Sequence, residues 1–262
     1  MNINEFKDLI DDICIPGIAE SWDNSGYQVK INSESVSKVL VALEITEKVI
    51  EEAIAKDVDV IVTHHPLIFD PIKSVCEDSV IGGYIVKLIK NGISVISTHT
   101  NFDKMEDGNN DYIGKLLGIK NMRFMGDDEG YSRMGSFDKP LSLREAAHLV
   151  AEKFDIDESF FHLIGNPDKM ISKLAWCSGS GSEFITLAAS KGCDLFITGD
   201  VKYHTAQTAS ELGICVIDAG HFGTEIIFVE NMASQIENYA KKEKIELEVI
   251  RSEVDINPFT RV

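Results

Sequence analysis

The sequence predicts an α/β protein made of two similar lobes, each with a mixed, mostly parallel sheet flanked by helices. Short β-branched runs such as "VDVIV" alternate with amphipathic helical stretches, which is typical of buried parallel strands. The order strand, helix, strand occurs twice, about half a chain apart. In both copies polar residues follow the strands. We interpret the copies as an internal repeat whose lobes face each other, so that their strand ends meet at one crevice.

The first lobe is expected to span residues 1–125. It begins with an amphipathic helix, "MNINEFKDLIDDI", and continues with a strand, a helix and a strand that end at "VTHH". Thr46 is the expected cap of that helix, with Glu47 in its first turn. A second helix stops at Gly92, and a second buried strand follows it. Residues 243–262 are predicted to pack back on this lobe.

The second lobe is expected to span residues 126–262. An acidic loop, "MGDDEGYSRMGSF", leads to a helix whose start carries a capping box, Ser142 with Glu145. The pattern of the first lobe then returns. "GICVIDAGHFGTE" matches the earlier "GISVISTHTNFD", and "GCDLFITGD" matches "DVDVIVTHH". The matched polar endings favour a true repeat over a chance likeness between parallel-sheet units.

The charge and the cysteines limit the function and the compartment. A net charge of -18 argues against a broad nucleic-acid-binding face, which needs clustered Lys and Arg. The 5 cysteines are widely spaced and form no C-x-x-C pair, so they are predicted to be buried thiols of a reducing compartment. We found no signal peptide and no apolar stretch that could span a bilayer. The expected location is the cytoplasm, without membrane contact.

The polar residues at the predicted strand ends have the chemistry of metal ligands. They are His64, His65, His99, Asp103, Asp200, His221 and Glu225. Imidazole and carboxylate groups suit zinc, iron, manganese or nickel, and parallel strands bring such residues to one edge of a sheet. Adjacent histidines on extended backbone point apart, so His64 and His65 are expected to hold different ions. A pair of divalent metals, as in two-metal hydrolases, is therefore the hypothesis for this chain.

Three further motifs are less specific, and each has a structural and a functional interpretation. "CSGSGSEF" is either a tight strand-to-helix turn capped by Ser182 or a phosphate site formed by exposed amides. "ITGDVKYH" is either a solvated helix start or a place where Lys202 binds an anion and His204 moves protons. "WDNSG" either closes over the crevice or is a packed turn, and the bulk of Trp22 favours packing.

Six separated motifs resemble, in order and spacing, those of the NIF-three-like family, whose members are also called GTP cyclohydrolase type 2 proteins. They are "ESWDNSGYQV", "VTHHPLIF", "STHTNFD", "AWCSGSGSEF", "ITGDVKYH" and "DAGHFGTE". The resemblance covers about residues 4–257, in a short form without the inserted middle domain. It implies a dinuclear metal site between the lobes and a toroidal homohexamer, a trimer of dimers. Its metal ligands fall on His64, His65, Asp103, His221 and Glu225, and it places His99 outside the first ligand set. Glu44 stands where Asp is common.

The expected function is therefore a metal-dependent hydrolase. Two divalent ions would activate a water, and hydroxide would attack a C–N bond of a nucleotide or a related small molecule, possibly GTP. His99, Glu44 or His204 would orient that water or supply a proton. Phosphoester or amide hydrolysis fits the same ligands. A non-catalytic regulatory or metal-chaperone protein is the alternative from another class.

Overall fold

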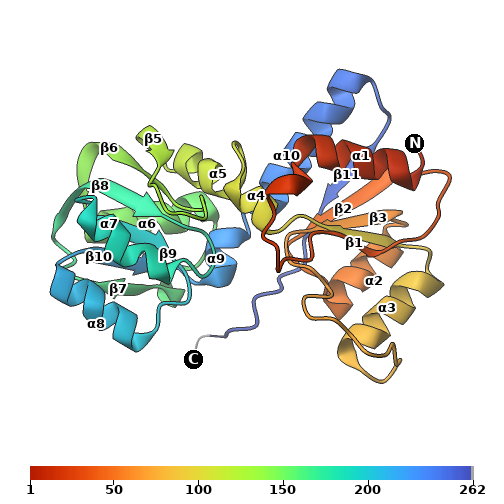
Figure 1. Cartoon of the computed structure of the whole chain (residues 1–262), viewed down its shortest axis with the longest axis horizontal. Helices are drawn as coiled ribbons and strands as arrows, with labels where there is room; N and C mark the ends of the chain where they lie inside the picture. Colours follow the sequence, from red (N-terminus) through yellow and green to blue (C-terminus); the bar gives the residue numbers. More distant parts are fainter. Residues whose placement is uncertain (261–262) are drawn as a thin grey trace. The chain divides into compact units, whose positions relative to one another are not determined.

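The computed structural model describes residues 1–260 and divides the chain into two compact units (Figure 1). The first unit comprises Met1–Met105 and Phe228–Ile256. The second comprises Glu106–Ile227 and the described residues that follow Ile256. Each unit has its own sheet with helices on both faces, which confirms the predicted α/β class.

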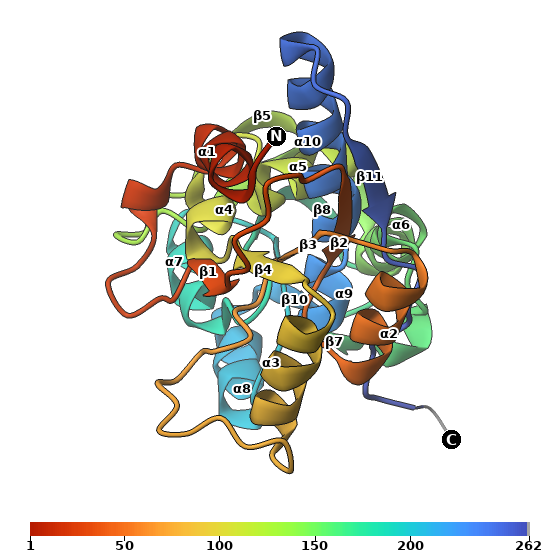
Figure 2. The same ribbon diagram turned by 90° about the vertical axis from the view of Figure 1, so that its right-hand side faces the viewer.

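The first unit is built on a five-stranded sheet. In spatial order the strands are β1 (Gly26–Val29), β4 (Ser94–Ser97), β3 (Val60–Thr63), β2 (Lys38–Ala42) and β11 (Glu248–Arg251). All neighbours pair in parallel except β1 with β4. Figure 2 shows the two helical layers on either side of this sheet, α2 (Glu47–Ala55) and α3 (Val80–Lys90) on one face, α1 (Ile3–Ile13) and α10 (Phe228–Glu243) on the other.

The second unit is built on a six-stranded sheet. Its spatial order is β5 (Lys120–Phe124), β6 (Arg133–Ser142), β8 (Met170–Trp176), β9 (Leu195–Thr198), β10 (Cys215–Asp218) and β7 (His162–Ile164). One face packs apolar side chains against α5 (Asn109–Leu116) and α6 (Leu143–Phe154), with Trp176 fully buried among them. The other face packs against α7 (Ile185–Ser190) and α8 (Tyr203–Leu212).

The topology confirms the internal repeat. The first sheet contains the order β1-β4-β3-β2, and the second contains β7-β10-β9-β8, in the same order along the chain. In each case three strands are parallel and the first strand lies antiparallel at the edge. A very short helix follows the equivalent strand in each unit, α4 (Thr100–Lys104) after β4 and α9 (His221–Glu225) after β10. The polar endings noted in the sequence lie at these equivalent places.

Several details differ from the sequence-based predictions. The boundary falls after Met105 instead of residue 125, and α10 joins the first unit, because its apolar face and β11 complete that unit's layers. The second sheet has three antiparallel and two parallel pairings, so it is not mostly parallel. The cause is the middle segment: instead of a long loop it forms a β5–β6 hairpin, whose turn is held by Asp127.

The local signals at helix ends and the cysteines mostly behave as predicted. Thr46 Oγ1 accepts the amide of Val49, and Ser142 and Glu145 form the predicted capping box. Four cysteines are buried free thiols, whereas Cys76 is exposed, so the prediction is wrong for that residue. The remaining short helices are single turns of 3-10 type, at Pro16–Ile18, Glu158–Phe160 and Ser182–Phe184. No helix among residues 1–260 is both long and apolar enough to cross a membrane.

The carboxylate of Glu52 joins the returning C-terminal segment to α2. It accepts hydrogen bonds from Lys56 (2.8 Å), from the Ser252 hydroxyl (2.5 Å) and from the Glu253 amide (3.1 Å). Burial alone would raise the pKa of Glu52, but these donors together hold that pKa below its usual range. A lowered pKa in the folded state means that the carboxylate stabilises the fold above about pH 4 and loses this effect as the pH falls further.

We expect Glu52→Gln to lower the free energy of unfolding by about 2 kcal/mol at pH 7, because charge-assisted hydrogen bonds are replaced by neutral ones. Urea unfolding at pH 7 and at about pH 3 measures this, and the difference from wild type should shrink at the lower pH. Glu51→Gln is the matched control, since the Glu51 side chain on the same helix is 62% exposed. An equal loss in both variants, or a pH-independent loss, would contradict the prediction.

Candidate metal centre

His64 and His65 lie immediately after β3, where the backbone makes a fixed turn. Both of their amides donate to the carbonyl oxygen of Leu43, at 3.1 and 3.0 Å. Pro66 follows and restricts His65 to extended backbone. The His64 side chain is fully buried, while that of His65 is 23% exposed. The apolar strand thus ends in one buried and one accessible imidazole.

The contact of His64 with Thr98 indicates which of its nitrogens carries the proton. Nδ1 lies 2.9 Å from the carbonyl oxygen of Thr98. Because a carbonyl only accepts, Nδ1 carries the proton and a neutral ring presents its lone pair at Nε2. Nε2 lies 3.5 Å from Oδ2 of Asp103, a buried residue of α4. A buried lone pair opposite a buried carboxylate is suited to a cation, and this hydrogen-bond pattern is the one that metal-ligating histidines adopt.

A third histidine completes the group in the first unit. One potential ligand atom from each of His64, His65 and His99 lies within 4.8 Å of the others. The His99 ring centroid is 5.2 Å from that of His64 and 5.8 Å from that of His65. Glu44, a candidate for proton transfer, has its Oε2 3.5 Å from Nδ1 of His65. The first unit therefore gathers five of the predicted residues, His64, His65, His99, Asp103 and Glu44, at the ends of β2, β3 and β4.

Asp23 holds His99 in place. Its Oδ1 lies 2.9 Å from Nδ1 of His99, and its Oδ2 accepts the hydroxyls of Ser25 and Thr100 and the Thr100 amide. Complete burial of this side chain would by itself raise the pKa of Asp23, but the hydrogen bonds from His99, Thr100 and Ser25 hold the pKa well below its usual range. The ionised carboxylate therefore fixes the orientation of the His99 ring.

In the second unit, His221 and Glu225 lie one turn apart on α9. Nε2 of His221 is 2.9 Å from Oε2 of Glu225, and Nδ1 is 2.7 Å from Oδ2 of Asp200. The predicted His-x-x-x-acid pair thus shares one helical face here. The equivalent pair in the first unit does not behave in this way: His99 precedes α4 and hydrogen-bonds Asp23, while Asp103 approaches His64.

Gly179 leaves the space that Glu225 occupies. Its backbone has a φ of +62°, and a Cβ atom there would lie 2.2 Å from Oε1 of Glu225 and 3.3 Å from Nε2 of His221. Its amide donates to the Thr224 hydroxyl at 2.8 Å, which fixes the turn against α9. Within each unit, the imidazole and carboxylate groups with their supporting hydrogen bonds have the chemistry of ligands for a divalent metal ion.

The turn around Ser182 does not act as predicted. The helix start at Ser182–Phe184 has Gly181 as its cap residue and no side-chain cap bond, so the prediction of a Ser182 cap is wrong. The amides of Ser178, Gly179 and Gly181 already donate to the side chains of Asn110, Thr224 and Thr198. These bonds use the donors that a phosphate would need, which favours the structural interpretation of this motif.

Lys202 and His204 lie at the solvated start of α8. Lys202 is the cap residue, and both side chains are exposed. His204 packs its ring edge against Tyr203, at 5.4 Å between centroids. "WDNSG" also differs from the prediction, because Trp22 is 59% exposed while the Asp23 side chain is buried.

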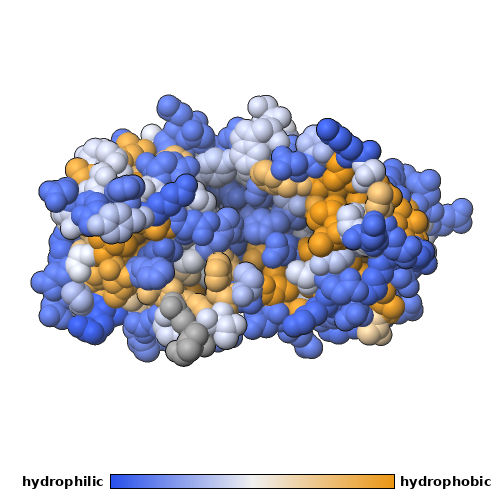
Figure 3. Space-filling view, turned by 90° about the horizontal axis from the view of Figure 1, so that it is seen from below, coloured by the Kyte–Doolittle hydropathy of each residue, from blue (hydrophilic) through white to orange (hydrophobic). Residues whose placement is uncertain are grey.

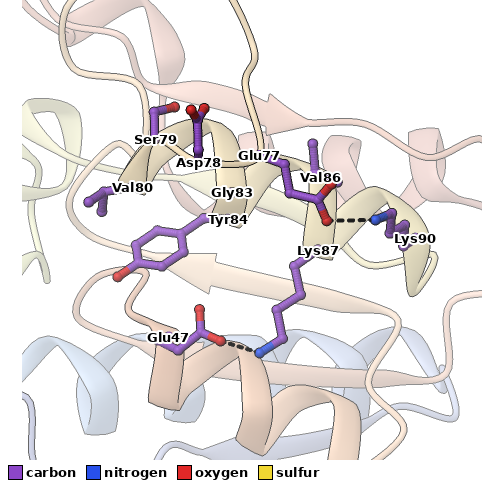
Figure 4. Close-up of a pocket in the computed structure, with 10 residues that line it drawn as sticks. All are labelled: Glu47, Glu77, Asp78, Ser79, Val80, Gly83, Tyr84, Val86, Lys87 and Lys90. Carbon is purple, nitrogen blue, oxygen red and sulfur yellow. Dashed lines mark hydrogen bonds and ion pairs between the residues drawn. The ribbon is translucent and has the colours of Figure 1, made fainter.

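A pocket elsewhere in the first unit contains none of these residues. Figure 4 shows that it lies between Glu47 of α2 and one side of α3, together with the residues that precede α3. Each of its lysines is ion-paired: Lys87 with Glu47, and Lys90 with Glu77 at 2.8 Å. Since both cations are already neutralised, the pocket is not a strong site for an anionic ligand.

Sequence reasoning did not assign the roles of Asp23 and Asp200. Asp200 is one of the polar residues predicted at strand ends, and Asp23 lies in a motif for which the sequence favours a packed turn. Each fixes the Nδ1 side of a histidine that is distant in sequence. Asp200 carries one signal of its own, a left-handed φ of 57°, but that signal exists only in the structure.

Comparison with known proteins places the chain in one family. The family model described as Duf34/NIF3 (NGG1p interacting factor 3) matches residues 1–258. A Clostridium acetobutylicum protein named GTP cyclohydrolase 1 type 2 homolog is 34% identical, over 99% of this chain and 98% of its own length. The NIF3 homolog of Schizosaccharomyces pombe is 31% identical over 98% of this chain and 97% of its own. A hypothetical protein of Staphylococcus aureus has the same fold, with a TM-score of 0.92 and 28% identity over 100% of this chain and 99% of its own.

We expect Gly179→Ala to displace Glu225 and weaken metal binding at the His221–Glu225 pair. Gly213→Ala is the matched control, because Gly213 has a similar φ of +72° but nothing within 4 Å of a Cβ atom. Both variants should lose roughly 1–2 kcal/mol of unfolding free energy to backbone strain, and Gly179→Ala should lose more. Thermal unfolding with and without added Zn²⁺ measures both effects. Equal stability and an equal response to Zn²⁺ in the two variants would show that the close approach of residue 179 to Glu225 affects neither folding nor metal binding.

Proposed function

Because the chain belongs to the Duf34/NIF3 family, we propose that it is a metal-dependent hydrolase that acts on a nucleotide or a related small molecule. One observation carries this proposal: the buried His64 ring, with Nδ1 bound to the Thr98 carbonyl and Nε2 opposite the Asp103 carboxylate. The nucleotide comes from the name of the relatives, GTP cyclohydrolase 1 type 2 homolog, which supports hydrolysis of a C–N bond in GTP as the first reaction to test.

Two divalent metal ions per chain, of zinc, iron, manganese or nickel, are the proposed cofactor. The proposed ligands are His64, His65, Asp103, His221 and Glu225, whose nitrogen and carboxylate donors suit these ions. Bound divalent ions supply Lewis-acid chemistry and lower the pKa of a coordinated water. Asp23 and Asp200 act as positioning residues, because each holds a histidine through its Nδ1 atom.

The residues around the ligands have proposed roles in proton transfer and substrate binding. His99 is held by Asp23 with its other nitrogen free to take or give a proton, and Glu44 lies against His65 from the end of β2. His204, exposed on α8, is a further candidate for carrying protons, and Lys202 beside it offers positive charge to an anionic substrate. Ser182 keeps only a structural role in this proposal.

The assembly and the location are also proposals. The family resemblance supports a homohexamer, arranged as a ring-shaped trimer of dimers, in the cytoplasm. A net charge of -18 argues against nucleic acid as a partner.

We expect about two divalent ions per chain in wild-type protein by elemental analysis. A variant with His65→Ala and Asp103→Asn should lose most of the metal and any GTP hydrolysis while keeping its circular dichroism spectrum. The matched control is His148→Ala, because His148 is 74% exposed on α6 and belongs to no candidate group. Full metal content without turnover would favour a regulatory or metal-chaperone protein. Wild-type protein that contains no metal and takes up none of zinc, iron, manganese or nickel would refute both the hydrolase and the metal-chaperone proposals.

We expect Asp200→Asn to weaken metal binding roughly 10-fold to 100-fold. The neutral amide of Asn accepts the hydrogen bond from Nδ1 of His221 more weakly than the carboxylate does. Asn tolerates the left-handed backbone at this position, so the fold should persist. Competition with a fluorescent zinc chelator gives the affinity. Asp168→Asn serves as the control, since Asp168 is 83% exposed and pairs only loosely with Arg144, at 3.8 Å. Unchanged affinity would remove Asp200 from the metal centre.

A further inference from the structure

Two large aromatic side chains beside the histidine group are exposed. Trp22 is 59% exposed and Phe69 is 53% exposed. Figure 3 shows one face of the molecule, on which hydrophobic patches lie among hydrophilic residues. Single exposed apolar residues are normal on folded proteins, whereas apolar side chains that adjoin each other on the surface are a feature of ligand and partner sites.

The two rings contact each other and the same imidazole. Their centroids are 5.9 Å apart at an interplanar angle of 55°. Trp22 meets the His99 ring edge to face at 6.1 Å, and Phe69 meets it at 6.2 Å, with interplanar angles of 76° and 79°. Because His99 belongs to the three-histidine group, the aromatic pair is continuous with the candidate metal ligands.

The backbone beneath both rings is anchored by several hydrogen bonds. Asp23, the neighbour of Trp22, binds His99, Ser25 and Thr100. Ile68, the neighbour of Phe69, accepts a hydrogen bond from Asn24 at 2.6 Å and donates to Gln28 at 3.0 Å. The two segments are therefore tied to each other, and the rings are presented on a rigid support. A surface that is ordered before binding loses little entropy when a ligand stacks on it.

We infer that Trp22 and Phe69 form a stacking platform for a planar nitrogen heterocycle, such as a purine base, and hold it beside His65 and His99. Tryptophan and phenylalanine faces stack on any aromatic base, and the tilted pair offers one face and one edge to such a ring. This inference rests on the proposed function for the reaction that follows, and it adds the residues that would hold the base.

The two tryptophans of the chain make the test direct, since Trp22 is exposed and Trp176 is fully buried. Guanosine titrated into the metal-free protein should quench the exposed fluorescence, and ribose 5-phosphate, which has no base, should not. The quenching should persist in Trp176→Phe and vanish in Trp22→Leu. By equilibrium dialysis, Trp22→Leu and Phe69→Leu should each bind guanosine about tenfold more weakly. Phe259→Leu is the control, because Phe259 is exposed and has no ring contact with the histidines.

Three results would overturn the platform. They are equal guanosine binding in Trp22→Leu and wild type, binding of ribose 5-phosphate as tight as that of guanosine, or protection of Trp22 from iodide by a second copy of the chain. Loss of the platform and loss of the proposed function are distinguishable. Guanosine binding to a chain that never hydrolyses a nucleotide would refute only the hydrolase, and hydrolysis with unchanged KM in Trp22→Leu would refute only the platform.

Discussion

The parallel pairing of β3 with β4 brings the His64 ring to the carbonyl oxygen of Thr98, and the arrangement around the histidines depends on that contact. Thr63 pairs with Ser97 in the ladder, so the residues just beyond them, His64 and Thr98, leave the sheet side by side. A fully buried imidazole is costly unless its polar atoms are satisfied. The Thr98 carbonyl satisfies Nδ1, which fixes the tautomer, and the Nε2 lone pair then faces the Asp103 carboxylate at 3.5 Å. Because both of these groups are acceptors, a cation or a proton between them is needed to satisfy them.

The internal repeat explains why the second unit offers a related set of groups with different supporting contacts. Both units end a parallel strand and start a short helix that carries an acid, Asp103 on α4 and Glu225 on α9. In the first unit, however, the ring paired with the acid comes from the neighbouring strand β3, whereas in the second unit His221 and Glu225 belong to one helix. Divergence has kept the chemistry at the strand ends and changed which side chains meet.

The sequence alone predicts those parts of the fold and the site that depend on local pattern. β-branched runs followed by histidines locate His64 and His65, and capping chemistry locates the starts of α2 and α6. Contacts between distant segments are not encoded locally. Asp23 lies 76 residues from His99, and β11 pairs with β2 although the whole second unit separates them in sequence. The β5–β6 hairpin was missed because "RMGSFDKPLS" mixes Gly, Pro and charges, and pairing on both sides of β6 outweighs those low strand propensities.

The hydrogen-bond acceptors at Nδ1 also differ between the histidines, and this difference affects how strongly the opposite nitrogen donates electrons. His64 donates to a neutral backbone carbonyl, whereas His99 and His221 each hydrogen-bond a carboxylate. A carboxylate behind an imidazole makes the opposite nitrogen a stronger electron donor than a carbonyl does. Asp23 is buried and Asp200 is 52% exposed, so solvent screens the second pair more than the first. The imidazoles of this chain therefore differ in donor strength, and the partner behind each ring sets that strength.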